Sequence, residues 1–164
     1  MSDRKLTHFD KTGKVKMVDI SHKQPTERLA KAAGKILLKK STVKLLKEKA
    51  LTKGDAIATA KIAGILAAKK VSELIPLTHP LNITYCDLQF EIKSTAVVVT
   101  SEVKMSGRTG PDIEAITSVA VALLTIYDMV KSVDRSATLT EIHLLEKSGG
   151  KSGNYCRSEK LPRM

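Results

Sequence analysis

The alternation of apolar and polar residues along the chain predicts two long helices. Residues 54–75 (GDAIATAKIAGILAAKKVSELI) are rich in alanine, isoleucine and leucine, and Asp55 is a favoured N-cap residue. Residues 112–133 carry a long apolar stretch and follow Pro111, which suits the start of a helix. A shorter helix is expected at 41–50, which opens on a serine, another favoured N-cap. The small residues of the first long helix would allow close packing against a sheet or another helix.

Three further segments alternate with the period of two that is typical of β-strands: 83–92, 95–105 and 138–146. A fourth segment, 26–38, is ambiguous, because it is rich in alanine like a helix but shows no clear period. Strands that pair mostly antiparallel form a sheet that helices can cover on one face. The pattern therefore predicts an α+β sandwich, with an antiparallel sheet packed against long helices.

The length of 164 residues suits one domain, 1–164, whose ends at 1–5 and 154–164 are expected to be flexible. No signal peptide is visible, and the longest apolar run, 115–127, is shorter than the ~20 residues that cross a bilayer. The two cysteines lie far apart and form no CxxC pair, which favours reduced thiols over a zinc site or a disulfide framework. We therefore expect a soluble, cytoplasmic protein.

A net charge of +11 is the first functional clue, because a basic chain suits an anionic partner: nucleic acid, a phosphorylated metabolite or a membrane surface. Single-stranded nucleic acid is bound partly by aromatic stacking, and this chain has two Phe, three Tyr and no Trp. Its lysines are also spread along the sequence rather than clustered. A nucleic-acid-binding protein explains the charge but little else, and it remains the competing class.

The segment 147–153 (KSGGKSG) is rich in glycine. A P-loop needs a glycine five positions before the glycine of its Gly-Lys pair, where this chain has Leu145, and a helix afterwards, where this chain has a polar tail. Backbone N–H groups and the ammonium groups of Lys147 and Lys151 could still bind an anion. From these residues alone, a mobile basic loop is an equally good interpretation.

Asp128 and Lys131 are three residues apart on the second long helix and share a face. A surface ion pair is the usual interpretation of such spacing. However, Asp128 ends a long apolar run, where the helix leaves the core. A lysine close to apolar packing can lose part of its preference for the charged form, and we expect Lys131 to exchange protons near neutral pH.

Glu114 lies fourteen residues before Asp128 on the same helix, which places it ~21 Å away. The two carboxylates of one chain therefore cannot both touch one small reacting group. If both belong to an active site, the substrate is long or two subunits share the site. The second possibility predicts an oligomer.

Three other candidates are weak when taken singly. His79 lies in LIPLTHPL, where two prolines stiffen the backbone, but a lone loop histidine is more often structural than catalytic. Lys53 directly precedes the helix cap and is more simply a solvated loop lysine. Arg28 lies in the ambiguous segment and indicates nothing alone. The other histidines show no ligand spacing with His79, so no metal site is proposed.

Taken together, six motifs in order carry a more specific signal: LTHFD…GKVKMVDI (6–20), KGDAIATAKIAGILAAK (53–69), LIPLTHPL (74–81), TGPDIEAIT (109–117), LLTIYDMVK (123–131) and KSGGKSG (147–153). In this combination the chain resembles the molybdenum cofactor biosynthesis protein C (MoaC) family, the cyclic pyranopterin monophosphate synthases. The resemblance covers about residues 6–153. Each motif is long, and six in register are more specific than any one of them.

The resemblance implies a role for each matching residue. The catalytic residues would be Asp128, Lys53 and Lys131. The substrate pocket would be lined by Leu77, Thr78, His79, Ile113 and Glu114, with Arg28, Lys147 and Lys151 neutralising the phosphates. Two departures matter: Thr78 stands where the family usually has cysteine, and Pro111, Asp112 and Ile113 replace the usual residues of their motif.

The resemblance also implies a reaction, a fold and partners. Members convert 3′,8-cyclo-7,8-dihydroguanosine 5′-triphosphate to cyclic pyranopterin monophosphate, releasing pyrophosphate as lyases of molybdenum cofactor biosynthesis. They have a ferredoxin-like α+β fold and form hexamers built from dimers, with sites between subunits. They require no cofactor of their own, although Mg²⁺ can accompany the triphosphate, and a radical SAM GTP cyclase supplies the substrate. No nucleic acid or membrane partner is expected, and an inactive scaffold with the same fold remains an alternative.

Overall fold

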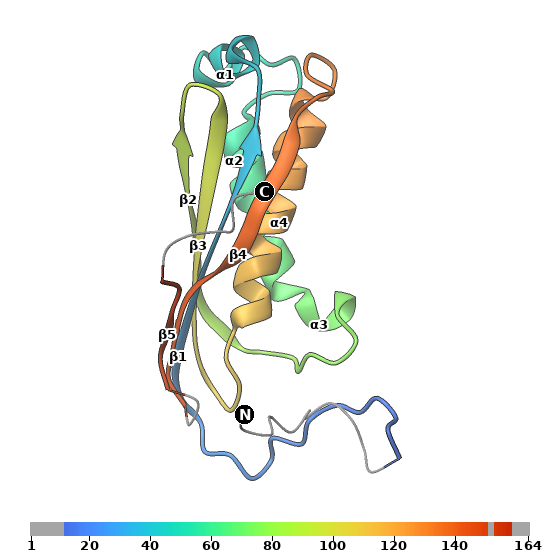
Figure 1. The fold of residues 1–164 in the computed structure, drawn as a ribbon, viewed down its shortest axis with the longest axis vertical. Helices are drawn as coiled ribbons and strands as arrows, with labels where there is room; N and C mark the ends of the chain where they lie inside the picture. The colour runs from blue at the N-terminus through green and yellow to red at the C-terminus, as the bar shows by residue number, and fades with distance from the viewer. Residues whose placement is uncertain (1–11, 151–152, 159–164) are drawn as a thin grey trace.

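The computed structural model describes residues 12–150 and 153–158. The elements follow one another as β1 (Thr26–Leu37), α1 (Lys40–Lys47), α2 (Ala56–Lys69), α3 (Val71–Leu74), β2 (Ile83–Ile92), β3 (Ala96–Gly107), α4 (Asp112–Val130), β4 (Thr138–Ser148) and β5 (Tyr155–Cys156). Figure 1 shows an elongated molecule in which α2 and α4 lie along one face of the sheet. Helix α1 lies at one end of the long axis, and the segment before β1 lies at the other.

The sheet has the strand order β2-β3-β1-β4-β5, and each neighbouring pair is antiparallel. Without the short elements, the chain runs β1-α2-β2-β3-α4-β4, and its four long strands lie in the order 2-3-1-4. This is the ferredoxin-like arrangement of two split β-α-β units. The predicted α+β class and the predicted packing of an antiparallel sheet on long helices are both confirmed.

The ambiguous segment is strand β1, at the centre of the sheet. Its even-numbered residues from 30 to 36, among them Ala30, Ala32 and Ile36, are buried toward the helices. A Cβ atom added to Gly34 would lie 2.8 Å from side-chain atoms of Val119 and Leu123 on α4. The small residues that resemble a helical composition are therefore what allows α4 to approach this strand so closely.

The two long helices pack closely on each other through a second glycine. A Cβ atom on Gly64 of α2 would lie 2.9 Å from the Ser118 carbonyl oxygen on α4 and 2.7 Å from Leu88 on β2. This confirms the expectation from the small residues of that helix. Helix α4 has the length and apolar composition of a membrane span, with half of the tested stretch buried inside the protein. Its inner face belongs to the core, where Val119, Leu123 and Ile126 are fully buried.

Several predicted boundaries differ from the structure. Helix α1 begins at Lys40 with Lys39 as its N-cap, so the predicted serine cap is wrong. The first long helix is interrupted at Lys70, between α2 and α3, and the second ends at Val130. Strand β4 continues through Ser148, into the segment that the sequence suggested was a loop.

The end of the chain has one described element. Within the segment that was expected to be flexible, Tyr155 and Cys156 form β5 and pair with Lys147 and Glu146 of β4. The other predicted flexible ends, 1–5 and 159–164, lie outside the described residues. So does Lys151.

Candidate active site

Two lysines from separate parts of the chain converge on Asp128. Lys53 donates hydrogen bonds from Nζ to the main-chain oxygen of Asp128 at 2.9 Å and to its Oδ2 at 3.0 Å. Lys131 approaches Oδ1 of the same carboxylate with its Nζ at 2.7 Å. We call Lys53, Asp128 and Lys131 the lysine–aspartate cluster. The structure thus brings together all three residues that the resemblance named as catalytic.

Local structure explains how Lys53 reaches Asp128. Asp55 caps α2 by accepting hydrogen bonds from the N–H groups of Ile57 at 3.1 Å and Ala58 at 3.0 Å. Its other oxygen pairs with Lys49 Nζ at 2.8 Å. Between Lys53 and this cap, Gly54 adopts a φ of 95°, which an L side chain rarely adopts. The Asp55 cap therefore fixes the end of the turn that carries Lys53.

The electrostatics of the cluster contradict one sequence-based expectation. Hydrogen bonds from Lys131 and Lys53 hold the pKa of Asp128 below its usual range. The hydrogen bond to Asp128 raises the pKa of Lys131, whereas apolar packing was expected to weaken its preference for the charged form. The reason is that half of the Lys131 side chain is exposed and its ammonium group faces a carboxylate. In the single chain, this pairing favours the charged, ammonium form of Lys131.

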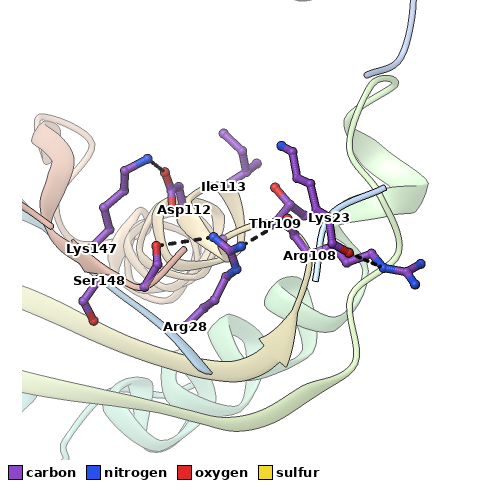
Figure 2. Close-up of a pocket in the computed structure, with 10 residues that line it drawn as sticks. Lys23, Arg28, Arg108, Thr109, Asp112, Ile113, Lys147 and Ser148 are labelled. Carbon is purple, nitrogen blue, oxygen red and sulfur yellow. Dashed lines mark hydrogen bonds and ion pairs between the residues drawn. The ribbon is translucent and has the colours of Figure 1, made fainter. Parts of the chain in front are cut away.

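A second group of functional candidates lies at the other end of α4. A pocket of about 260 Å³ is lined by Lys23, Arg28, Arg108, Thr109, Gly110, Asp112, Ile113, Lys147, Ser148 and Gly149. Figure 2 shows Arg28 between the Lys147–Asp112 pair on one side and the Arg108–Lys23 pair on the other. We call this site the basic pocket. Its four cationic side chains and one carboxylate give it a net positive charge, which suits an anionic ligand.

The guanidinium group of Arg28 joins the two loops that form the pocket. It donates hydrogen bonds to the carbonyl oxygens of Gly107 at 2.8 Å, Arg108 at 3.2 Å and Gly149 at 3.4 Å. Gly149 has a φ of 94°, and a Cβ atom there would clash with the Glu27 carbonyl oxygen at 2.1 Å. The glycine segment after β4 can therefore pass directly over β1 only because it has no side chain there.

The first turn of α4 contributes Asp112 and Ile113 to the same pocket. Lys147 donates a hydrogen bond to Asp112 Oδ2 at 2.7 Å. Oδ1 of this carboxylate is buried and has no hydrogen-bond partner in the described part of the chain. The N-terminus of a 19-residue helix opens here, and its dipole favours negative charge.

Glu114 behaves differently from the other predicted substrate residues. It is 3% exposed and does not line the basic pocket of the single chain. Burial raises its pKa to about 7, and the nearby charge of Asp112 adds to this effect. Glu114 is therefore a buried carboxyl group that gains or loses its proton near neutral pH.

The proline loop borders a neighbouring pocket. His79 and Pro80 line it together with residues 17–21 and Arg108, which also belongs to the basic pocket. The Thr78 hydroxyl donates a hydrogen bond to the Ile75 carbonyl oxygen at 2.8 Å, so it is used locally within the loop. Leu77 is partly buried beside it.

The structure therefore divides the predicted site into two groups. Arg28, Lys147 and Ile113 meet in the basic pocket with His79 nearby, whereas the lysine–aspartate cluster lies at the opposite end of α4. Asp128 lies fifteen positions after Ile113 on this helix, which corresponds to ~22 Å along the axis. A single chain does not bring the two groups together. Among the described residues, no three His, Cys, Asp or Glu side chains gather as metal ligands would.

Comparison with known proteins shows which family this chain belongs to. The profile described as "MoaC family" matches residues 17–150, which include the basic pocket, the proline loop and the lysine–aspartate cluster. The chain belongs to the MoaC family. It is 47% identical over 157 residues to the cyclic pyranopterin monophosphate synthase of Streptomyces griseus, covering 96% of this chain and 89% of that protein. It is 48% identical over 155 residues to the Clostridium botulinum protein of the same name, covering 93% and 98%. The Heliobacterium modesticaldum protein, also of that name, is 49% identical over 157 residues, covering 94% and 98%.

In this MoaC family member, three charged residues of the pocket were not expected from the sequence. Lys23 and Arg108 line it, and Arg108 donates a hydrogen bond to the Lys23 carbonyl oxygen at 3.0 Å. Asp112 had been noted only as a departure from the family pattern. One signal was available: the GRTGP turn places an arginine three positions before the N-cap of a helix, and anions bind at helix N-termini.

Proposed function

We propose that this chain is a cyclic pyranopterin monophosphate synthase, a lyase of molybdenum cofactor biosynthesis. It would convert 3′,8-cyclo-7,8-dihydroguanosine 5′-triphosphate to cyclic pyranopterin monophosphate and release pyrophosphate. Membership of the MoaC family and the shared name of the relatives support this proposal. The structural observation that carries it is the convergence of Lys53 and Lys131 on Asp128.

The basic pocket would hold the triphosphate. Four cationic side chains and a helix N-terminus line it, and Lys151 follows the same glycine segment. When a ribose-derived hydroxyl attacks the α-phosphorus, the bond to the β-phosphate oxygen breaks and pyrophosphate leaves. Cations positioned beforehand stabilise the charge that develops on the leaving group. The protein would need no cofactor of its own, and Mg²⁺ would enter only with the triphosphate.

The lysine–aspartate cluster would transfer protons during the rearrangement of the purine ring. Lys131, held as an ammonium ion by Asp128, would donate a proton as the five-membered ring opens. Lys53 would stabilise the developing negative charge, and Asp128 would orient both lysines. His79 would contact the substrate rather than carry the main proton transfer, together with Leu77, Thr78, Ile113 and Glu114.

A complete site would require two copies of the chain. Helix α4 exposes Ile113 and Leu124 on its outer face, and α2 exposes Ile62 and Leu66. Antiparallel packing of these faces around a twofold axis would place the cluster of one copy near the basic pocket of the other. We propose such dimers as the units of a hexamer in the cytoplasm, supplied with substrate by a radical SAM GTP cyclase.

The decisive experiment supplies the pure protein with enzymatically made cyclic dihydro-GTP. Cyclic pyranopterin monophosphate is followed as its fluorescent oxidation product, and pyrophosphate is measured in parallel. We expect both products in equal amounts, and we expect Lys131→Ala to lose turnover by at least ~100-fold while remaining folded. Absence of both products, from a folded protein that binds the substrate, would refute the proposal. An active Lys131→Ala variant would refute only the role of that lysine.

A further inference from the structure

Asp134, in the turn that follows α4, is a fully buried carboxylate with both oxygens bonded. Its residue exposure is 1%. Oδ2 accepts hydrogen bonds from the Lys39 main-chain N–H at 2.8 Å and the Thr42 hydroxyl at 3.0 Å. Oδ1 accepts one from the Ser136 hydroxyl at 2.7 Å. Burial opposes the charge, but these hydrogen bonds and the Lys39 ammonium group, 3.8 Å from Oδ1, outweigh it and hold the pKa of Asp134 below its usual range.

The main chain around Asp134 closes α4 at the lysine–aspartate cluster. The N–H of Asp134 donates to the Val130 carbonyl oxygen at 2.9 Å, and the N–H of Lys131 donates to Tyr127 at 2.9 Å. The turn between Lys131 and Asp134 is therefore ordered by the last carbonyl groups of the helix. Because Asp134 lies only three positions after Lys131, a displacement of Asp134 would also move Lys131.

The side chain of Asp134 fixes the start of α1 in the same way. Lys39 is the N-cap residue of α1, and it makes no side-chain cap hydrogen bond in the described part of the chain. Asp134 supplies a cap from a distant position by accepting from the Lys39 N–H and from Thr42 in the first turn. Figure 1 shows α1 at the end of the molecule where α4 terminates. One carboxylate thus joins the end of one helix to the beginning of another.

Helix α1 leads to Lys53 through a short path that is itself hydrogen-bonded. After Lys49, which has a φ of 52°, the N–H of Ala50 donates to Leu45 at 2.9 Å. The N–H of Gly54 then donates to Leu51 at 3.0 Å. The position of α1 therefore determines where the Lys53 turn lies relative to α4.

We propose that Asp134 is a positioning residue, which joins α1 to the end of α4 so that Lys53 meets Asp128 beside Lys131. This inference rests on the proposed function. Lys53 and Asp128 are 75 positions apart in sequence, and their contact requires that two separate elements keep a fixed separation. An error of about 1 Å in such a catalytic geometry can lower turnover by roughly 100-fold.

The experiment compares Asp134→Ala with Asp134→Asn. Alanine removes every acceptor, whereas asparagine can keep its amide oxygen toward Lys39 and Thr42 and turn its nitrogen toward the Ser136 hydroxyl. We expect Asp134→Ala to lower kcat by at least ~10-fold, with KM within ~3-fold because the basic pocket lies at the far end of α4. Asp134→Asn should recover most of this loss. An inactive wild-type protein in the same assay would refute the proposed function. An active wild type with an unaffected Asp134→Ala variant would refute only the inference about Asp134.

A second readout does not depend on activity. In the free protein, reductive methylation of Lys53 should become several-fold faster in Asp134→Ala, because its contact with Asp128 is weakened. Lys61, which pairs with Asp87 at 2.6 Å, is the internal control and should not change. Leu88→Ala, a buried substitution on β2, controls for a general loss of stability when both variants are assayed well below their Tm.

Two outcomes would overturn the inference. One is unchanged kcat and Lys53 labelling in a folded Asp134→Ala variant, and the other is an equal change of both in Leu88→Ala. If Asp134→Ala does not fold, Thr42→Val replaces it, with Thr42→Ser as the conservative control that keeps the hydroxyl. Faster Lys53 labelling in Thr42→Val but not in Thr42→Ser would support the inference, and equal labelling in the two would overturn it.

Discussion

Glu114 makes the stability of this protein depend on pH in a predictable direction. Its folded-state pKa is raised from 4.5 to about 7, chiefly by burial, so the folded state holds the proton more tightly than the unfolded state does. The stability from this group is therefore complete below pH 4.5 and is lost progressively as the pH rises to about 7. At 1.36 kcal/mol per pKa unit, the shift corresponds to a loss of about 3 kcal/mol.

Glu114→Gln removes this titration and keeps the shape of the side chain. We expect the free energy of unfolding of the variant, relative to the wild type, to rise by about 3 kcal/mol between pH 4.5 and pH 8. Urea unfolding at several pH values and one protein concentration measures this difference. Glu91→Gln, at a strongly exposed position on β2, is the matched control and should give a flat difference. A flat difference for Glu114→Gln as well would refute the argument from burial.

Two further substitutions test the pocket and the core. Arg28→Lys keeps the charge but cannot reach three carbonyl oxygens at once, so we expect KM for the triphosphate substrate to rise by roughly 10-fold with kcat within ~3-fold. An unchanged KM would show that the three hydrogen bonds of the Arg28 guanidinium group are not needed to hold the pocket in its binding geometry. Gly34→Ala places a Cβ atom 2.8 Å from Val119 and Leu123, and we expect a loss of about 2 kcal/mol in urea unfolding. A stabilised variant would mean that α4 can move away from β1 at little cost.

The resemblance named many of the candidate site residues, although not Lys23 or Arg108, and it did not predict their environments. Patterns along the chain singled out Asp128 and Lys131 as a pair, yet they led to the wrong direction for the Lys131 pKa. That direction depends on whether the ammonium group faces apolar packing or a carboxylate, and only the end of α4 in its folded surroundings decides this. Lys53 was indistinguishable from a solvated lysine because its partner lies 75 positions away.

Local periodicity and capping determined most of the elements by themselves. The helices α2 and α4 and the strands β2 and β3 follow from interactions between residues only a few positions apart, which a linear pattern records. The helix cap at Asp55 is also a local interaction, because Asp55 bonds to N–H groups two and three positions away. The separation of Glu114 from Asp128 on one helix was also readable in advance, because the rise of a helix is constant.

Only the tertiary structure decided that 26–37 is a strand, that Glu114 is buried, and which residues come together within each of the two groups of site residues. The composition of β1 suits a helix, but its residues form a strand because they pair with β3 and β4 and let α4 approach through Gly34. The basic pocket joins Arg28 to carbonyl groups 79 and 121 positions away. Contacts at such separations depend on how the whole sheet is ordered, and no local pattern of residues encodes that order.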